Sequence, residues 1–150
     1  MTPESRLAEY ETEADRLLGE TVALIPAALD PASGFSESEP RYAPTEGAAS
    51  ASDPAWWQAR ESLNLAAETD ASADAAAAIA AGLTDDGWRE SKVRETEGGA
   101  RITDGFRKDL DGGEWYIEVT WVQTRPEMAE VVEVLVVSPQ TVRGADAAGT

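Results

Sequence analysis

Apolar residues near the start of the chain recur at three- and four-residue spacing, the spacing of one face of an α-helix. They are Leu7, Tyr10, Ala14, Leu17, Leu18, Thr21 and Ile25. Thr2 is a suitable capping residue, Pro3 occupies the favoured first helical position, and Pro26 ends the helix at about Leu24. The pattern predicts an N-terminal helix within residues 1–29 that packs on a sheet. The alternative is a helix that presents this stripe to a partner.

Residues 30–55 are dense in Pro, Ser, Gly and acidic residues. Such a composition is typical of a linker or a long loop, so no regular secondary structure is predicted there. Phe35 and Tyr42 are the side chains that we expect to pin this loop to the rest of the molecule.

From residue 56 onward the pattern indicates a compact unit of strands and one helix. Alternating apolar positions predict a strand over 57–66, and an Ala-rich stripe predicts a helix over 73–85 that Gly87 ends. Turn signals then separate four strands, at 88–96, 101–109, 115–122 and 131–137. The last strand is apolar on both faces, so we expect it to be central or covered by a helix.

The short connections between these strands favour antiparallel pairing. The predicted fold class is therefore α+β, an antiparallel sheet of about five strands with helices packed on one face. One domain is expected, made of the helix in 1–29, the loop at 30–55, the α+β sheet unit at 56–143 and a frayed tail at 144–150.

Composition removes several kinds of chemistry from consideration. The 150 residues include 12 Lys and Arg against 29 Asp and Glu, a net charge of −17, with no Cys and no His. A disulfide, a thiolate nucleophile, a Cys/His zinc site and imidazole catalysis are thereby excluded. The acidic charge also disfavours binding to nucleic acid or to an anionic membrane.

The negative charge is unevenly distributed along the sequence. Residues 1–70 contain 14 acidic and 4 basic residues, whereas residues 88–125 contain 8 acidic and 7 basic residues. The hairpin region is therefore expected to have the mixed-charge surface of an ordinary antiparallel sheet. The acidic excess is interpreted first as a solubility feature and second as a recognition surface.

No motif marks a catalytic, cofactor or metal site. The segment Asp109–Glu114 has the oxygen ligands and glycines of a calcium loop, but it lacks the EF-hand spacing, and Asp-Gly is also a common hairpin turn. The sequence contains no dinucleotide-binding, P-loop or nucleophile-elbow pattern. We therefore assign no catalytic, cofactor or metal residues and expect a non-enzymatic protein. A weaker alternative is an enzyme that uses carboxylates and a bound metal ion.

Adjacent tryptophans suggest a binding surface. Trp56 and Trp57 follow Asp53-Pro54 and form a candidate aromatic platform for a ligand or partner, together with Tyr42 and Tyr116. The structural alternative is that one indole ring lies in the core and the other covers an edge of the sheet.

The segment Ala76-Ala-Ala-Ile-Ala-Ala-Gly-Leu-Thr-Asp-Asp-Gly-Trp88 resembles the "A-x-x-I-x-x-x-L-x-x-x-G-W" element of small actinobacterial lipoprotein-like domains. The tryptophan-led strand at 56–65, the hairpins and the closing Val134–Pro139 are similar too, and the resemblance covers most of 1–143. In that family the mature domain follows a lipobox Cys, and residues 1–11 look like the stretch after such an anchor. This chain contains neither the lipobox nor the Cys that follows Ser138-Pro139 in some relatives.

Two hypotheses about function follow. The resemblance implies a non-enzymatic, extracytoplasmic domain of the cell envelope, tethered to the membrane only through a lipid anchor that this chain lacks. Its expected partner is a protein or a cell-envelope component, with no nucleic acid, and we expect a monomer. The alternative is a cytoplasmic, acidic immunity or inhibitor protein that neutralises a basic toxin or nuclease by charge complementarity.

Overall fold

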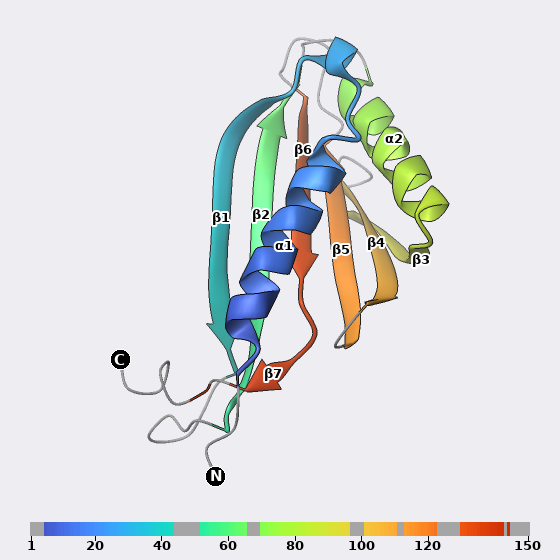
Figure 1. Ribbon diagram of the computed structural model, residues 1–150. Coiled ribbons are helices and arrows are strands. Elements are labelled where there is room, and N and C mark those ends of the chain that lie inside the picture. Colours follow the sequence, from blue (N-terminus) through green and yellow to red (C-terminus); the bar gives the residue numbers. More distant parts are fainter. Residues whose placement is uncertain are drawn as a thin grey trace.

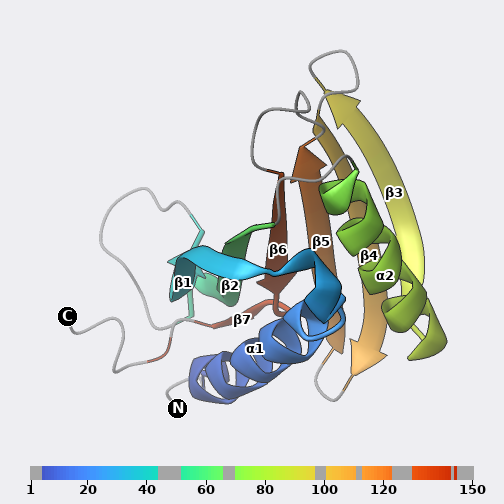
Figure 2. The same cartoon turned by 90° about the horizontal axis from the view of Figure 1, so that it is seen from above.

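Two α-helices lie on the same face of one antiparallel sheet in the computed structural model (Figures 1 and 2). The structure describes residues 5–43, 52–65, 70–96, 101–110, 113–122, 130–142 and 144. The helices are α1 (Leu7–Val22) and α2 (Ala71–Asp85), and a short 3-10 turn, η1 (Ala27–Leu29), follows α1. This arrangement confirms the predicted α+β class with helices on one face.

The sheet has more strands than predicted. They are β1 (Ala32–Tyr42), β2 (Pro54–Asn64), β3 (Arg89–Thr96), β4 (Arg101–Leu110), β5 (Gly113–Val122), β6 (Val131–Val137) and β7 (Thr141–Val142). Their spatial order is β1-β2-β6-β5-β4-β3, and β7 pairs with the first residues of β2. Strands β3 to β6 form the predicted meander, but β6 then pairs with β2 and joins the meander to the β1–β2 hairpin.

The apolar stripe of α1 faces the sheet as predicted. Leu7, Tyr10, Ala14, Leu17 and Thr21 are buried, and the helix packs chiefly on β2 and β6. The helix ends at Val22, two residues before the predicted end, because Pro26 and the turn η1 follow. The predicted cap at Thr2 and Pro3 lies outside the described residues.

Helix α2 begins at Ala71 and ends at Asp85, close to the predicted 73–85. Its buried side is small, with Ala75 and Ala76 beside Ile79 and Leu83, so the helix can approach β5 and β6 closely. Gly87 has φ 93, which confirms the left-handed stop predicted after this helix.

Strand β6 lies at the centre of the sheet, between β2 and β5. Val132, Val134 and Val136 are fully buried beneath the helices, whereas Leu135 and Val137, at alternate positions, lie on the opposite face and are partly exposed. The prediction of a central strand that is apolar on both faces is therefore confirmed.

The prediction that residues 30–55 form a loop without regular structure was wrong for residues 32–42, which form β1, and for residues 54 and 55, which begin β2. The strand lacks an apolar alternation because Ser36 and Ser38 occupy the positions that face the helices. Ser38 Oγ donates to Asp15 of α1 and accepts a hydrogen bond from Trp57 Nε1, at 2.6 and 2.8 Å. Small polar side chains thus occupy part of the helix side of this edge strand, which contains a β-bulge between Ser33 and Phe35.

Replacing Ser38 with Ala should lower the free energy of unfolding by about 1 kcal/mol, because the indole N–H of Trp57 loses its acceptor. Ser36→Ala, which removes an exposed hydroxyl from the same strand, should change it by less than about 0.5 kcal/mol. Urea unfolding followed by tryptophan fluorescence measures both. Equal changes in the free energy of unfolding for the two substitutions would contradict the hydrogen bond between Trp57 and Ser38.

Candidate functional site

The face of the sheet opposite the helices carries a continuous surface of side chains that, apart from the buried Thr120, are partly or fully exposed. No described helix covers this face (Figure 2). The strand register brings together on it the residues that we call the open sheet face: Trp56, Gln58, Arg60, Ser62, Thr103, Arg107, Tyr116, Glu118, Thr120, Val131, Glu133, Leu135 and Val137. Its centre is aliphatic and its flanks are charged.

Two of the predicted surface residues lie close together on this face. Gln58, Val137 and Tyr116 occupy one row across β2, β6 and β5. Because neighbouring strands lie about 4.8 Å apart, the backbones of Gln58 and Tyr116 are about 10 Å apart. Trp56 lies two residues from Gln58 on β2, and its Nε1 donates to Gln58 Oε1 at 2.7 Å. Tyr116 therefore lies opposite Val137, and Trp56 lies diagonal to it on the other neighbouring strand.

The other two predicted surface residues lie on the helix side of the sheet. Trp57 is buried at 8% exposure, and its backbone N–H donates to Ser138 Oγ at 2.8 Å. Tyr42 is opposite Ala55 and packs against the core. Trp57 is therefore too buried to belong to the predicted partner surface, and Tyr42 does not share a surface with Trp56 and Tyr116. The structural alternative for the tryptophan pair, one ring in the core and one outside, is the arrangement found.

Tyr116 is held in a fixed position on the open sheet face. Its hydroxyl donates to Glu118 Oε2 at 2.8 Å, and the guanidinium of Arg107 lies 4.6 Å from its ring centroid. The hydroxyl lies over Gly105, where an added Cβ would be only 2.5 Å away. The glycine thus provides the space in which this side chain lies along the sheet.

Arg60 of β2 links the charged groups on the other flank. Its guanidinium lies 5.2 Å from the ring of Phe35 and 3.8 and 3.9 Å from the carboxylates of Glu37 and Glu133. Its buried Nε has no hydrogen-bond partner in the described part of the chain. Both ion pairs are long, so the guanidinium retains hydrogen-bonding capacity.

Sequence reasoning did not include Leu135 and Val137 of β6 in the candidate surface. The signal was present, because β6 was recognised as apolar at every position except Glu133. What was missing was the side of the sheet that the two helices leave uncovered. The position of β6 between β2 and β5 then makes Leu135 and Val137 the aliphatic centre of that uncovered side.

The described residues do not bring together three or more side chains suitable for holding a metal ion. In the segment that resembles a calcium loop, Glu114 is paired with Arg89 and Arg107 at 3.4 and 3.1 Å. Asp111 and Gly112 lie outside the described residues. The contacts of Glu114 are those of a cross-strand ion-pair network.

No family model and no curated protein matches the chain. Among solved structures, the Pseudomonas aeruginosa protein PA94, described as of unknown function and provisionally as a regulator, aligns with a TM-score of 0.41 and 13% identity over 70% of this chain and 71% of that one. In the described residues, no helix is long and apolar enough to cross a membrane.

A buried carboxyl group lies on the helix side of β4. Asp104 is 6% exposed, and its Oδ1 has no hydrogen-bond partner among the described groups. Burial, followed by the hydrogen bond and charge repulsion with Glu90, raises the pKa of Asp104 from 3.8 to about 7, although the backbone of Gly105 acts in the opposite direction. The folded protein therefore holds a proton on Asp104 that the unfolded chain releases at a lower pH.

Stability should consequently fall as pH rises from about 4 to about 7, because the unfolded state binds fewer protons across this interval. Asp104→Asn replaces the group with a permanently neutral one, so it should raise the urea midpoint at pH 8 and change it little at pH 4. Asp109→Asn, on the exposed side of the same strand, is the control. A midpoint that responds equally to both substitutions at pH 8 would count against the buried proton.

Proposed function

We propose that this chain is a non-enzymatic binding domain whose open sheet face holds a protein partner. We further propose that it acts as a monomer outside the cytoplasm, in the cell envelope, where the full-length protein is tethered by a lipid anchor outside this chain. The observation that carries the binding role is the row of Gln58, Val137 and Tyr116, flanked by Trp56, on a face that no described helix covers.

The chemistry of this face supports a protein as the partner. Leu135 and Val137 provide an aliphatic centre, and aromatic side chains with a polar edge lie beside it, a combination enriched in protein interfaces. Arg60 and Arg107 alternate with Glu118 and Glu133 around the centre. A polyanion would be repelled by half of these groups and a polycation by the other half, whereas a protein surface can match both signs.

The geometry also supports binding without catalysis. The charged groups of the open sheet face contact neighbouring side chains: Glu118 and Arg107 contact Tyr116, and Arg60 pairs with Glu133. Such contacts fix side chains in position, which lowers the entropy that is lost when a partner binds. The proposed location is supported by the resemblance of Ala76–Trp88 and Val134–Pro139 to lipoprotein-like domains.

A photo-crosslinking amino acid introduced at Gln58 should join the protein to one partner in its native host, because Gln58 lies beside Val137. The same group at Ala77, on the exposed side of α2, should not. Leu135→Lys should abolish the Gln58 product, because it places an ammonium group in the aliphatic centre. Equal crosslinking from both positions, or a product that survives Leu135→Lys, would refute the assignment of this face.

The proposed location has a separate test. Fractionation of the native host should place the full-length protein in the envelope fraction, with a covalently attached acyl chain detectable by metabolic labelling with a fatty acid. A native gene that begins at Met1 and a protein found only in the cytoplasmic fraction would overturn the tether and favour the cytoplasmic inhibitor, without affecting the crosslinking result.

A further inference from the structure

A second surface lies on the opposite side of the molecule from the open sheet face, along α1. Two cavities of about 830 and 310 Å³ border the same side of this helix. The α1 residues that line them follow three- and four-residue spacing over the whole helix and the two residues after it: Arg6, Glu9, Tyr10, Glu13 and Arg16 in the larger cavity, and Leu17, Glu20, Thr21, Ala23 and Leu24 in the smaller. We call this surface the α1 trough.

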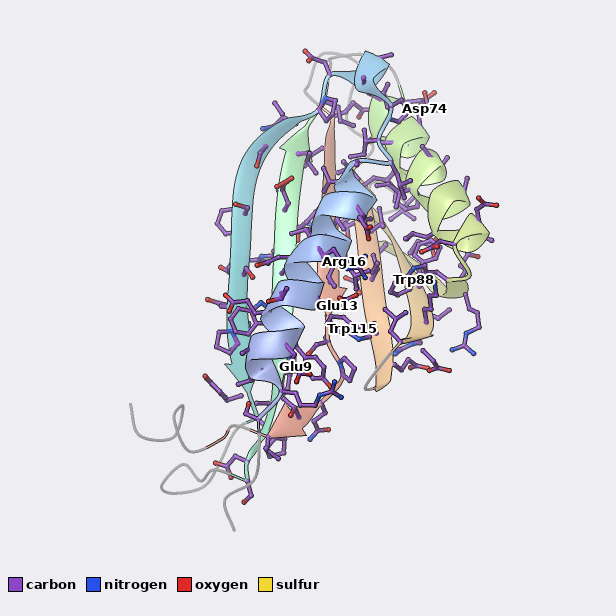
Figure 3. The ribbon with its side chains drawn as sticks, viewed as in Figure 1. Glu9, Glu13, Arg16, Asp74, Trp88 and Trp115 are labelled. Carbon is purple, nitrogen blue, oxygen red and sulfur yellow. The ribbon has the colours of Figure 1, made fainter. Side chains whose placement is uncertain are left out.

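The two cavities are adjacent. Arg16 lines the larger one and Glu20 the smaller one, and their side chains form an ion pair at 2.6 Å across one turn of the helix. Figure 3 shows Glu9, Glu13 and Arg16 in succession along α1, with Trp115 of β5 beside them. Residues 6 to 24 correspond to a length of about 27 Å at 1.5 Å per residue, so the trough is long enough for an extended or helical segment.

The smaller cavity is mainly apolar. Leu17, Leu83 and Trp88 form its buried surface, and Leu24 lies at its rim with 36% of its surface exposed. Leu24 fits against Gly82 of α2, where an added Cβ would lie 2.6 Å from a Leu24 methyl group. Leu24 and Phe35 are the exposed large hydrophobic residues among those described. Leu24 and the apolar lining of this cavity are contiguous, and a contiguous apolar surface of this kind can accept an aliphatic side chain of a partner.

The larger cavity is polar at its walls and aromatic at its floor. Tyr10 and Trp115 meet edge to face, with ring centroids 5.4 Å apart, and the indole N–H of Trp115 has no acceptor in the described part of the chain. On the α1 wall, Arg6 pairs with Glu9 and Arg16 with Glu13. Side chains of these pairs are between 33% and 67% exposed, so each pair contributes little to stability and can exchange partners.

Negative charge predominates in the α1 trough. The carboxylates that line its two cavities belong to Glu9, Glu13, Glu20, Asp86 and Asp109, and the cations are Arg6 and Arg16. Lys108 adds one further cation near the rim, where it contacts Asp86. Neither helix has a basic residue in its last turn, so the negative ends of α1 and α2 add to the potential around the smaller cavity.

We propose that the α1 trough docks a basic amphipathic segment of a partner protein. The segment inserts one large aliphatic side chain into the cavity at Leu24 and Trp88. Its Lys or Arg side chains reach the carboxylates of Glu9, Glu13 and Asp109, replacing Arg6 and Arg16 in their exchangeable pairs. This inference goes beyond the function proposed above, because it concerns the helix side of the molecule, and either surface can fail its test without the other.

A synthetic amphipathic peptide of Lys and Leu is a suitable probe, and NMR of the tryptophan indole N–H groups is the measurement. Binding should shift the signals of Trp88 and Trp115, which line the trough, and leave that of Trp56 on the open sheet face unchanged. Replacing the leucines of the peptide with Ser should weaken binding at least about tenfold, the equivalent of one buried aliphatic side chain. Replacing its lysines with Glu should abolish binding.

Matched variants of the protein separate docking from general attraction to an acidic surface. Leu24→Lys places a cation at the rim and should weaken binding at least about tenfold, whereas Ala77→Lys makes the same change in net charge outside the trough and should weaken it less than about twofold. Glu13→Gln should weaken binding about threefold, and Asp74→Asn, which removes a charge at the far end of α2 (Figure 3), should have no effect.

A second substitution covers the case in which Leu24→Lys disturbs folding. Gly82→Ala places one methyl group in the space under Leu24. The methyl group displaces the flexible Leu24 side chain, so the substitution should also weaken binding of the Lys/Leu peptide. Shifts confined to Trp56, equal effects of Leu24→Lys and Ala77→Lys, or equal affinity for the Lys/Leu and Lys/Ser peptides would each overturn the proposal.

Discussion

The antiparallel pairing of β6 with β2 is the interaction on which the rest of the structure depends. The hairpin of β1 and β2 follows α1 in the chain, whereas β6 closes the meander that begins after α2, so this one ladder joins the two halves of the sequence. It also brings Val132, Val134 and Val136 beneath both helices, where they are fully buried. Backbone hydrogen bonds and apolar burial thus reinforce each other at the same strand.

The same pairing separates the molecule into two surfaces of different character. Since both helices lie on one side of β6, the alternate residues Leu135 and Val137 must lie on the other, among interleaved charges of both signs. Among the described residues, acidic side chains outnumber basic ones on α1 and around the ends of α2, on the helix side. The net charge of −17 for the whole chain therefore does not represent the local charge of either surface.

Most of the fold was predictable because its periodicity is local. The stripe of α1, the helix that ends at Gly87 and the strands from Arg89 to Val137 each carry their own pattern of apolar positions. Strand β1 was missed because its helix side carries Ser36 and Ser38 instead of apolar residues, and the two hydrogen-bond partners of Ser38, Asp15 and Trp57, lie about twenty residues away in the sequence. The composition of 30–55 therefore resembled a linker.

The candidate site was harder to predict than the fold, for a related reason. Alternation along β2 shows that Trp56 and Trp57 face opposite sides, but the side that the helices cover depends on contacts between distant segments. The α1 trough likewise depends on the space between α1 and the β4–β5 hairpin, which no pattern within either segment specifies.

Strand β1 forms an edge of the sheet, and its irregularities limit how the molecule can associate. Pro40 has no N–H to offer to a further strand, the β-bulge between Ser33 and Phe35 interrupts the regular edge, and Glu37 and Glu39 place charges along it. An incoming strand would find neither a continuous row of donors nor a neutral surface. The sheet therefore stops at β1 and resists edge-to-edge aggregation, which leaves its two broad surfaces available to other molecules.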